Sequence, residues 1–175
     1  MKDIKTIVAK QLDENQVAFL VSMINKVYQE SESDIWKVGH ERIALLRMIE
    51  IIAKGELLLA VTDSEICGCI HLEPMDDVMA KFKMLVANPK FKGQGVGSML
   101  VNYAEEVARV NGANKMQLEL LVPTDFEQPD KIFLNSWYTR IGYQKTEEHD
   151  VEYLNPGLSK LLKTGCVAEI YHKFI

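Results

Sequence analysis

A glycine-rich loop between an apolar segment and an amphipathic one constrains the fold of this chain more than any other feature of its sequence. Residues 84–87 (MLVA) are apolar, glycines follow at positions 93, 95 and 97, and apolar side chains then recur at helical spacing to residue 111. Glycines let a backbone turn sharply and approach a ligand closely, and a helix start presents unpaired N–H groups and the positive end of a dipole. The segment therefore predicts a strand, a phosphate-binding loop and a helix, in that order.

Positive charge gathers around this loop, although the chain as a whole is acidic. The formal net charge is −5, yet no acidic residue lies between Asp77 and Glu105, and the same stretch contains Lys81, Lys83, Lys90 and Lys92. A basic patch steers an anionic ligand toward it, although lysines that protect a sheet edge would give the same pattern. An acidic chain is a poor candidate for nucleic-acid binding, which depends on neutralising phosphates. We therefore expect a phosphate-bearing ligand and no nucleic acid.

Hydrophobic periodicity along the rest of the chain predicts an alternation of strands and helices. Strands are expected at residues 3–10, 56–62, 66–73, 81–87, 115–122, 143–150 and 167–174. Helices are expected after Asp13, at about 41–54, at about 97–111, from Pro129 to Ile141 and, as a short helix, after Pro156. Asp13 and Gln16 have the spacing of a capping box. Hairpins next to crossover helices predict one mixed α/β sheet with helices on both faces.

Length and composition favour one soluble domain over residues 1–175. A chain of 175 residues with 47% hydrophobic residues can bury a core without the help of disulfides or a structural metal. No apolar run approaches the ~20 residues of a membrane span, and the first five residues lack a signal core. We expect a cytoplasmic protein without a membrane partner, and a nuclear location is an open alternative.

The three cysteines do not indicate a metal site. No second Cys or His pair lies at zinc spacing. Cys67 and Cys69 are two residues apart in a predicted strand, so both are expected to point to the same face of the sheet. Together with Cys166 they are expected to be buried thiols.

Two common phosphate-binding loops fit the glycines poorly. A P-loop needs Gly-Lys-Ser/Thr, whereas Gly97 is followed by Ser98 and Met99. A dinucleotide-binding G-x-G-x-x-G loop follows its strand directly, and residues 93–98 come close to it, with Glu119 near the place of the ribose-binding acid. However, residues 88–92 separate the strand from the glycines. A nucleotide-binding oxidoreductase is therefore the weaker alternative.

Two motifs resemble those of the GNAT superfamily of N-acetyltransferases. Residues 92–97 (KGQGVG) resemble its signature (R/Q)-x-x-G-x-(G/A), and residues 88–91 (NPKF) resemble the usual lead-in. Residues 137–143 (WYTRIGY) are similar to its second motif, (aromatic)-Tyr-x-(basic)-x-Gly-(aromatic). The element order agrees over nearly the whole chain. The resemblance implies a GNAT-type acyl-CoA N-acyltransferase fold, with a mixed, mostly antiparallel sheet that splays open between the signature strand and the next.

The resemblance implies transfer of an acetyl group from acetyl-CoA to a primary amine, by direct attack in a ternary complex and without a metal. A noncatalytic acyl-CoA-binding or sensing domain is the alternative, because it would need the same loop. Lys92 replaces the commoner Arg or Gln of the signature, and Lys131 replaces an Asn that touches the cofactor in many members. The implied cofactor contacts are Leu85, Val86, Ala87, Lys92, Gly93, Gln94, Gly95, Val96, Gly97, Ser98, Lys131 and Asn135.

The resemblance also implies roles in catalysis and acceptor binding. Tyr138 matches the usual proton donor to the departing thiolate, and its structural alternative is a core aromatic. A protonated amine must lose a proton before it attacks, and Glu73, Glu119, His71 or a water chain are the candidate bases. The acceptor, a small-molecule or peptide amine, is expected near Tyr28, Trp36, Arg42 and His71. A homodimer is compatible with such folds, in which dimers are common.

Overall fold

The computed structural model describes residues 3–175, in which seven strands form one sheet of order β1-β2-β3-β4-β5-β7-β6. Every neighbouring pair is antiparallel except β4 and β5, which are parallel. The mixed, mostly antiparallel sheet predicted from the sequence is confirmed. The strands are β1 Lys5–Val8, β2 Leu57–Val61, β3 Ile66–Pro74, β4 Met79–Ala87, β5 Lys115–Pro123, β6 Gln144–Asp150 and β7 Cys166–Phe174.

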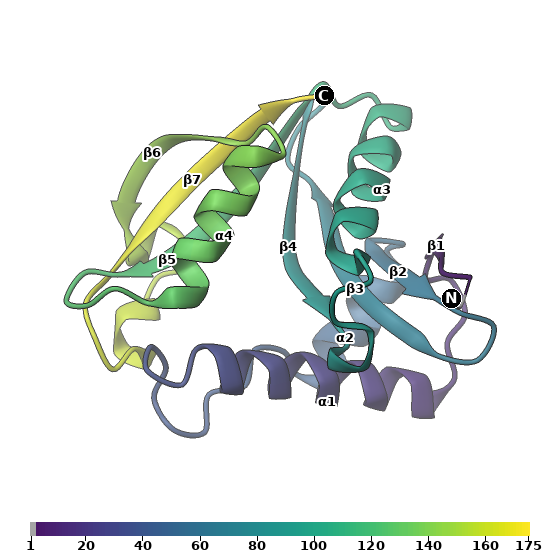
Figure 1. Ribbon diagram of the computed structural model, residues 1–175, viewed down its shortest axis with the longest axis horizontal. Helices are drawn as coiled ribbons and strands as arrows, with labels where there is room; N and C mark the ends of the chain where they lie inside the picture. Colours follow the sequence, from purple (N-terminus) through teal and green to yellow (C-terminus); the bar gives the residue numbers. More distant parts are fainter. Residues whose placement is uncertain (1–2) are drawn as a thin grey trace.

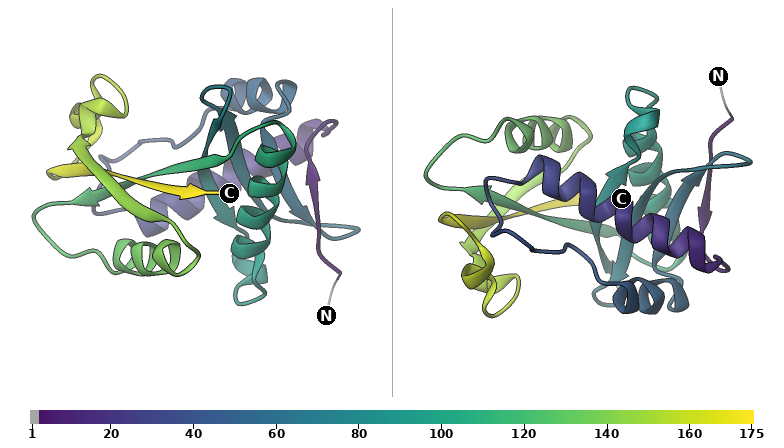
Figure 2. Two further views of the ribbon diagram at one scale, coloured as in Figure 1. Left: turned by 90° about the horizontal axis from the view of Figure 1, so that it is seen from above. Right: turned by 90° about the horizontal axis from the view of Figure 1, so that it is seen from below.

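Four α-helices cover the sheet, two on each face (Figures 1 and 2). Side chains of α3 and α4 share one core with the sheet, and those of α1 and α2 share a second core with its other face. The helices are α1 Glu14–Ser31, α2 Leu45–Ala53, α3 Val96–Val110 and α4 Pro129–Arg140, and the 3₁₀ turns are η1 Pro89–Phe91, η2 Val151–Tyr153 and η3 Leu158–Leu161. Within residues 3–175, none of the helices combines the length and the apolar character needed to span a membrane.

The first helix begins as its capping pattern predicts. The Asp13 carboxylate accepts from the Gln16 amide at 2.9 Å, and the Gln16 side chain accepts from the Asp13 amide at 3.0 Å. The second helix begins at Leu45, four residues later than expected. The Asn25 side chain bonds both backbone groups of Ile43, at 2.9 and 3.0 Å, and this contact holds the preceding segment extended.

A β-bulge in β3 reverses the direction expected for one cysteine. Ala60 pairs with Gly68 and Val61 pairs with Ile66, so Cys67 has no partner on β2. The extra residue shifts the side-chain alternation. Cys67 therefore packs into the core beneath α3 while Cys69 packs into the core beneath α1, and the prediction that both face the same way is wrong. Both thiols and that of Cys166 are buried, as expected.

The sheet opens between β4 and β5, which are paired only at residues 79–81 and 115–117. Beyond these pairs the two strands diverge into a V, and α1 runs across its open end (Figures 1 and 2). A second bulge on β4 lies beside the divergence, because Met84 and Leu85 stand opposite the single residue Ile70. Met84 takes a positive φ of 52° there, a conformation uncommon outside glycine. The predicted splay therefore coincides with an irregular stretch of β4.

Candidate functional site

The segment after β4 is anchored in the core before it reaches the glycines. The buried Asn88 side chain donates to the Ile66 carbonyl at 3.1 Å and accepts from the Lys90 amide at 3.1 Å, which caps η1. Phe91 is also buried, whereas residues 92–95 are exposed. The lead-in thus presents the glycine loop at the surface, at the start of α3.

The glycine loop offers a group of unpaired backbone donors. Gly93 and Gly95 have positive φ angles of 79° and 75°, which favour glycine, and Gly95 is the N-cap of α3. Within residues 3–175, no backbone or side-chain acceptor bonds the N–H groups of Gly93, Gly95, Val96, Gly97 or Ser98. Five open N–H groups at the positive end of a helix form a binding site suited to a phosphate.

The basic patch expected around this loop is largely neutralised. Lys81 contacts Glu119 at 3.1 Å, Lys83 contacts Glu73 at 2.6 Å and Lys90 contacts Glu65 at 3.1 Å. These carboxylates come from β5, from β3 and from the turn before β3, so the local sequence did not reveal them. Lys92 has no ion-pair partner in the described part of the chain and is the lysine left to meet an anion at the loop.

One further glycine, Gly68 of β3, holds α3 against the sheet. A Cβ atom there would lie 2.6 Å from the Val86 carbonyl oxygen and 2.8 Å from Val96 Cγ1. Only glycine permits this close packing at the start of α3. The sequence analysis did not single out Gly68, although a glycine between two cysteines in an apolar strand is a signal for close backbone approach.

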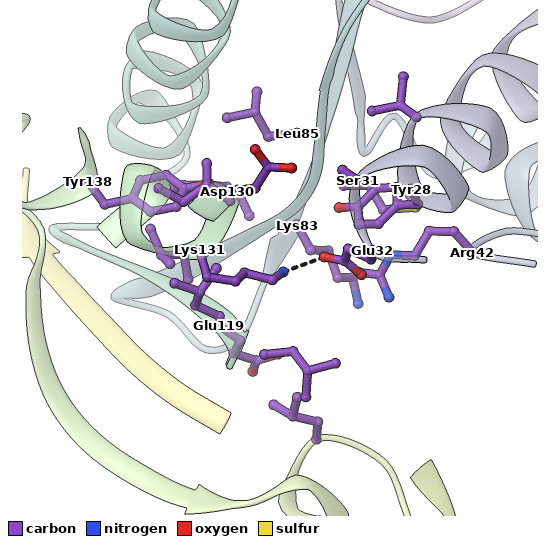
Figure 3. A pocket seen from close by; sticks show the side chains of 18 of the residues that line it. Tyr28, Ser31, Glu32, Arg42, Lys83, Leu85, Glu119, Asp130, Lys131 and Tyr138 are labelled. Carbon is purple, nitrogen blue, oxygen red and sulfur yellow. Dashed lines mark hydrogen bonds and ion pairs between the residues drawn. The ribbon is translucent and has the colours of Figure 1, made fainter. Parts of the chain in front are cut away.

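A cavity of about 590 Å³ occupies the V between β4 and β5. Its walls come from β4, β5, the end of α1, the start of α4 and residues 154–158. Leu85 and Tyr138 enter it from opposite sides of the V, as Figure 3 shows. Of the three β4 residues expected to contact a cofactor, Leu85 lines this cavity, whereas Val86 is buried and Ala87 is exposed beyond it.

Tyr138 is held in an aromatic cluster with its hydroxyl free. Its ring centroid lies 5.0 Å from that of Trp137, 6.0 Å from Phe82 and 6.1 Å from Tyr143. No residue within 3–175 bonds the Tyr138 hydroxyl, and burial raises the pKa of this phenol above its ordinary value. Tyr138 therefore combines the packing of a core residue with a protonated hydroxyl at the cavity.

The three candidate bases occupy different environments. Glu119 lines the cavity and is bonded by Lys81 and, at 3.2 Å, by the Gln117 amide. Glu73 lies outside it; burial raises its pKa, but the hydrogen bond and charge of Lys83 outweigh burial and hold the pKa below its usual range. His71 is fully buried, bonded to Glu56 at 3.0 Å, and burial lowers its pKa. The structure does not bring His71 to the cavity.

The residues expected at the acceptor side are brought together. Tyr28, Trp36 and Arg42 line the main cavity, and with Glu32 they also line a second cavity of about 310 Å³. The Arg42 guanidinium carbon lies 4.8 Å from the centre of the Tyr28 ring. These side chains form the wall between the two cavities.

Lys131 and Asn135, the two cofactor contacts expected on α4, are engaged with the protein. Lys131 lines the cavity but is buried in an ion pair with Glu32. Asn135 donates to the Tyr171 hydroxyl at 2.6 Å and does not line the cavity. Asp130, which the sequence analysis missed, lines the cavity one residue before Lys131. Its position after Pro129 is typical of an acid in the first turn of a helix, so the sequence offered no separate signal.

Comparisons with known proteins identify the kind of domain to which this site belongs. The model of the acetyltransferase (GNAT) domain matches residues 53–145, more than half of the chain and a range that includes β4, the glycine loop and Tyr138. No curated protein sequence matches the chain.

Solved structures share the fold at low sequence identity. An acetyltransferase from Streptococcus agalactiae has a TM-score of 0.70 at 20% identity, covering 98% of both chains. A GNAT-family acetyltransferase from Staphylococcus aureus has a TM-score of 0.67 at 14% identity, covering 98% of this chain and 99% of that one. A GNAT-family acetyltransferase from Elizabethkingia anophelis with acetyl-CoA bound has a TM-score of 0.59 at 15% identity, covering 99% and 97%.

Proposed function

Because this chain belongs to the GNAT acetyltransferase family, we propose that it transfers an acetyl group from acetyl-CoA to a primary amine in a ternary complex. The observation that carries the proposal is the position of five open backbone N–H groups, at residues 93 and 95–98, in the first turn of α3 and the loop that joins it to β4, the strand that forms one side of the V-shaped cavity. A long ligand with a pyrophosphate at one point and a reactive group at its end matches this layout. Coenzyme A thioesters have that form.

The glycine loop would hold the pyrophosphate through its N–H groups, with Lys92 as a nearby positive charge. The pantetheine arm would then run along Leu85 toward the cavity. The acetyl-CoA-bound structure from Elizabethkingia anophelis supports this choice of ligand, because it has the same fold. The tight packing of Gly68 against Val86 and Val96 would keep the loop and the strand in fixed relative positions.

In the transfer itself, the amine nitrogen attacks the acetyl carbonyl carbon and the carbon–sulfur bond breaks. The sulfur leaves as a thiolate, and we assign Tyr138 as the donor of the proton that it takes up. A raised phenol pKa keeps this proton on Tyr138 at neutral pH. The hydroxyl has no competing acceptor within residues 3–175, so it is available to the sulfur.

The attacking amine must lose its own protons, and we assign Glu119 as the base that accepts the first, directly or through water. Among Glu73, Glu119 and His71, only Glu119 lines the cavity. Its carboxylate contacts the Lys81 ammonium at 3.1 Å. Glu73 would act on this site only indirectly, through Lys83.

Thiol release from acetyl-CoA in the presence of a panel of primary amines tests the proposal. Amine-dependent release, with calorimetric binding of coenzyme A, is the expected result. Binding of coenzyme A without release for any amine would instead indicate the noncatalytic acyl-CoA-binding function. Absence of binding by folded protein would overturn the assignment of the loop.

A further inference from the structure

The charged side chains of the main cavity are paired with two exceptions. Seven charged residues line it, and three of its four cations have a carboxylate partner: Lys81 with Glu119, Lys83 with Glu73 and Lys131 with Glu32. Within residues 3–175 no ion pair involves Arg42 or Asp130. Arg42, which is partly exposed, and Asp130, which is exposed, are therefore the two charged residues of the cavity without an ion-pair partner in residues 3–175.

Arg42 is only partly exposed to water, and it has no carboxylate partner within residues 3–175. Its Nε is buried and has no hydrogen-bond partner within the described chain, and its guanidinium lies over the Tyr28 ring at 4.8 Å. A buried donor left unsatisfied is costly, and a guanidinium binds a carboxylate through two parallel hydrogen bonds. Arg42 also lines the second cavity, where the ammonium groups of Lys37 and Lys163 contact only backbone carbonyls. Glu32 is the acidic residue that also lines this second cavity, and its carboxylate is paired with Lys131.

Asp130 lies on the same helix as the proposed proton donor. It belongs to the first turn of α4, the helix that also supplies Tyr138, and it forms no hydrogen bond with another described residue. Figure 3 shows its carboxylate turned toward the middle of the cavity, below Leu85, while Arg42 enters from the opposite side. An ammonium group that meets Asp130 would therefore lie inside the cavity that Leu85 and Tyr138 also line.

We propose that the acceptor is a zwitterion, an amine that also carries a carboxylate, with the ammonium bound by Asp130 and the carboxylate bound by Arg42. This inference rests on the proposed acetyl transfer and specifies its substrate class as amino acids. A plain alkylamine or a polyamine would satisfy Asp130 but leave Arg42 unpaired, and a second ammonium near Arg42 would be repelled. An amino acid satisfies both charges at once.

Pairs of substrates that differ only in a carboxylate measure how much this group contributes to acceptor binding. The series from glycine to 6-aminohexanoate is compared with n-alkylamines of the same chain lengths, by thiol release from acetyl-CoA. The wild-type protein is expected to have a kcat/KM at least about tenfold higher for the best amino acid than for its alkylamine, as one charge-assisted hydrogen bond would give. The chain length of that best acceptor reports the distance between the two charges.

Variants of the two charges separate their roles. Arg42→Gln should raise the KM for amino acids at least about tenfold and lower the preference for amino acids over alkylamines by the same factor. Arg42→Lys, which keeps the charge, should retain part of the preference. Asp130→Asn should raise the KM for both substrate classes, since both carry an ammonium. Arg47→Gln is the matched control, because Arg47 pairs with Glu50 on the surface of α2 and does not line the cavity.

Two outcomes overturn this inference alone: equal activity toward alkylamines and amino acids, or an equal loss for both classes in Arg42→Gln with normal thermal unfolding and coenzyme A binding. If Arg42→Gln does not fold, the substrate comparison in the wild-type protein and in Arg42→Lys decides the matter. Failure of the proposed function gives a different result, which is bound coenzyme A with no thiol release for any amine.

Discussion

The carboxylate of Glu32, just beyond the end of α1, forms a buried ion pair with the ammonium of Lys131 in the first turn of α4. The Trp36 indole donates to the second oxygen of the same carboxylate, and the Gln128 side chain donates to the Ser31 carbonyl beside it. These contacts join the two sides of the V at its open end, where the sheet itself provides no pairing.

Removing one partner of this pair should destabilise the protein strongly. Lys131→Ala leaves Glu32 buried without its counter-ion, so we expect the free energy of unfolding to fall by about 3–5 kcal/mol in denaturant titrations. Lys26→Ala, which breaks an exposed pair with Glu30, should change it by less than about 0.5 kcal/mol. Similar small losses in both variants would show that the buried pair is not a structural tie.

A negative side chain in the glycine loop should abolish coenzyme binding. Gly95→Glu places a carboxylate among the open N–H groups at the start of α3, and calorimetry with coenzyme A should detect no heat. Gly55→Glu is the matched control, because Gly55 has a similar φ of 71° with no atom near its absent side chain and lies at the end of α2. Equal loss of binding in both variants would point to backbone strain instead of the loop.

Removing the Tyr138 hydroxyl should slow turnover without weakening the fold. Tyr138→Phe removes the proposed proton donor, and kcat should fall about 10²-fold while the Kd for coenzyme A stays the same. The free energy of unfolding should change little, because the hydroxyl bonds no described residue. Tyr103→Phe on α3 serves as the control and should retain full kcat. Unchanged kcat in Tyr138→Phe would contradict the role of proton donor and leave Tyr138 with only a packing role in the aromatic cluster.

Substitution of Gly68 should be costly although the site is remote from the cavity. A methyl group would meet the Val86 carbonyl oxygen at 2.6 Å, and we expect Gly68→Ala to cost about 1–3 kcal/mol of unfolding free energy. At Gly97 the nearest atom to an added Cβ is 3.7 Å away on Trp137, so Gly97→Ala should be neutral or stabilising by up to about 1 kcal/mol. The contrast is measurable by thermal unfolding.

Stability should decline in mild acid because of His71. Burial lowers the pKa of His71 from the ordinary 6.5, and the Glu56 contact offsets this only in part. As the pH falls through 6.5, the unfolded chain takes up a proton that the folded chain does not, so the free energy of unfolding decreases until the lower folded pKa is reached. His71→Gln should flatten this slope. An identical slope in the variant and the wild-type protein would assign the acid sensitivity to other groups.

Local patterns in the sequence were sufficient to predict most of the fold. The capping pair Asp13 and Gln16, the Asp63–Glu65 turn and the glycine loop each act through neighbours in the chain, and each formed as predicted. The late start of α2 depends on Asn25 reaching Ile43 from another helix, and the direction of Cys67 depends on its pairing with β2. Such long-range contacts leave no periodic trace in the sequence.

The same distinction applies to the site. Tyr138 and the loop residues could be proposed from the sequence because they belong to contiguous motifs, and their roles stay predictions. The neutralisation of Lys81 and Lys83 could not be foreseen, because Glu119 and Glu73 come from neighbouring strands. Arg42 and Asp130 differ from the other charged residues of the cavity only in lacking an ion pair, and the ion pairs are visible only in the structure.

The two sides of the V between β4 and β5 are connected at the apex by strand pairing and across the open end by an ion pair. Three residue pairs join the strands at the apex, and the Glu32–Lys131 ion pair connects the two sides across the opening. A change in the angle between the strands would require breaking either the strand pairing or this ion pair. We therefore expect the width of the cavity to be set when the chain folds, so that a ligand enters without a large movement of either strand.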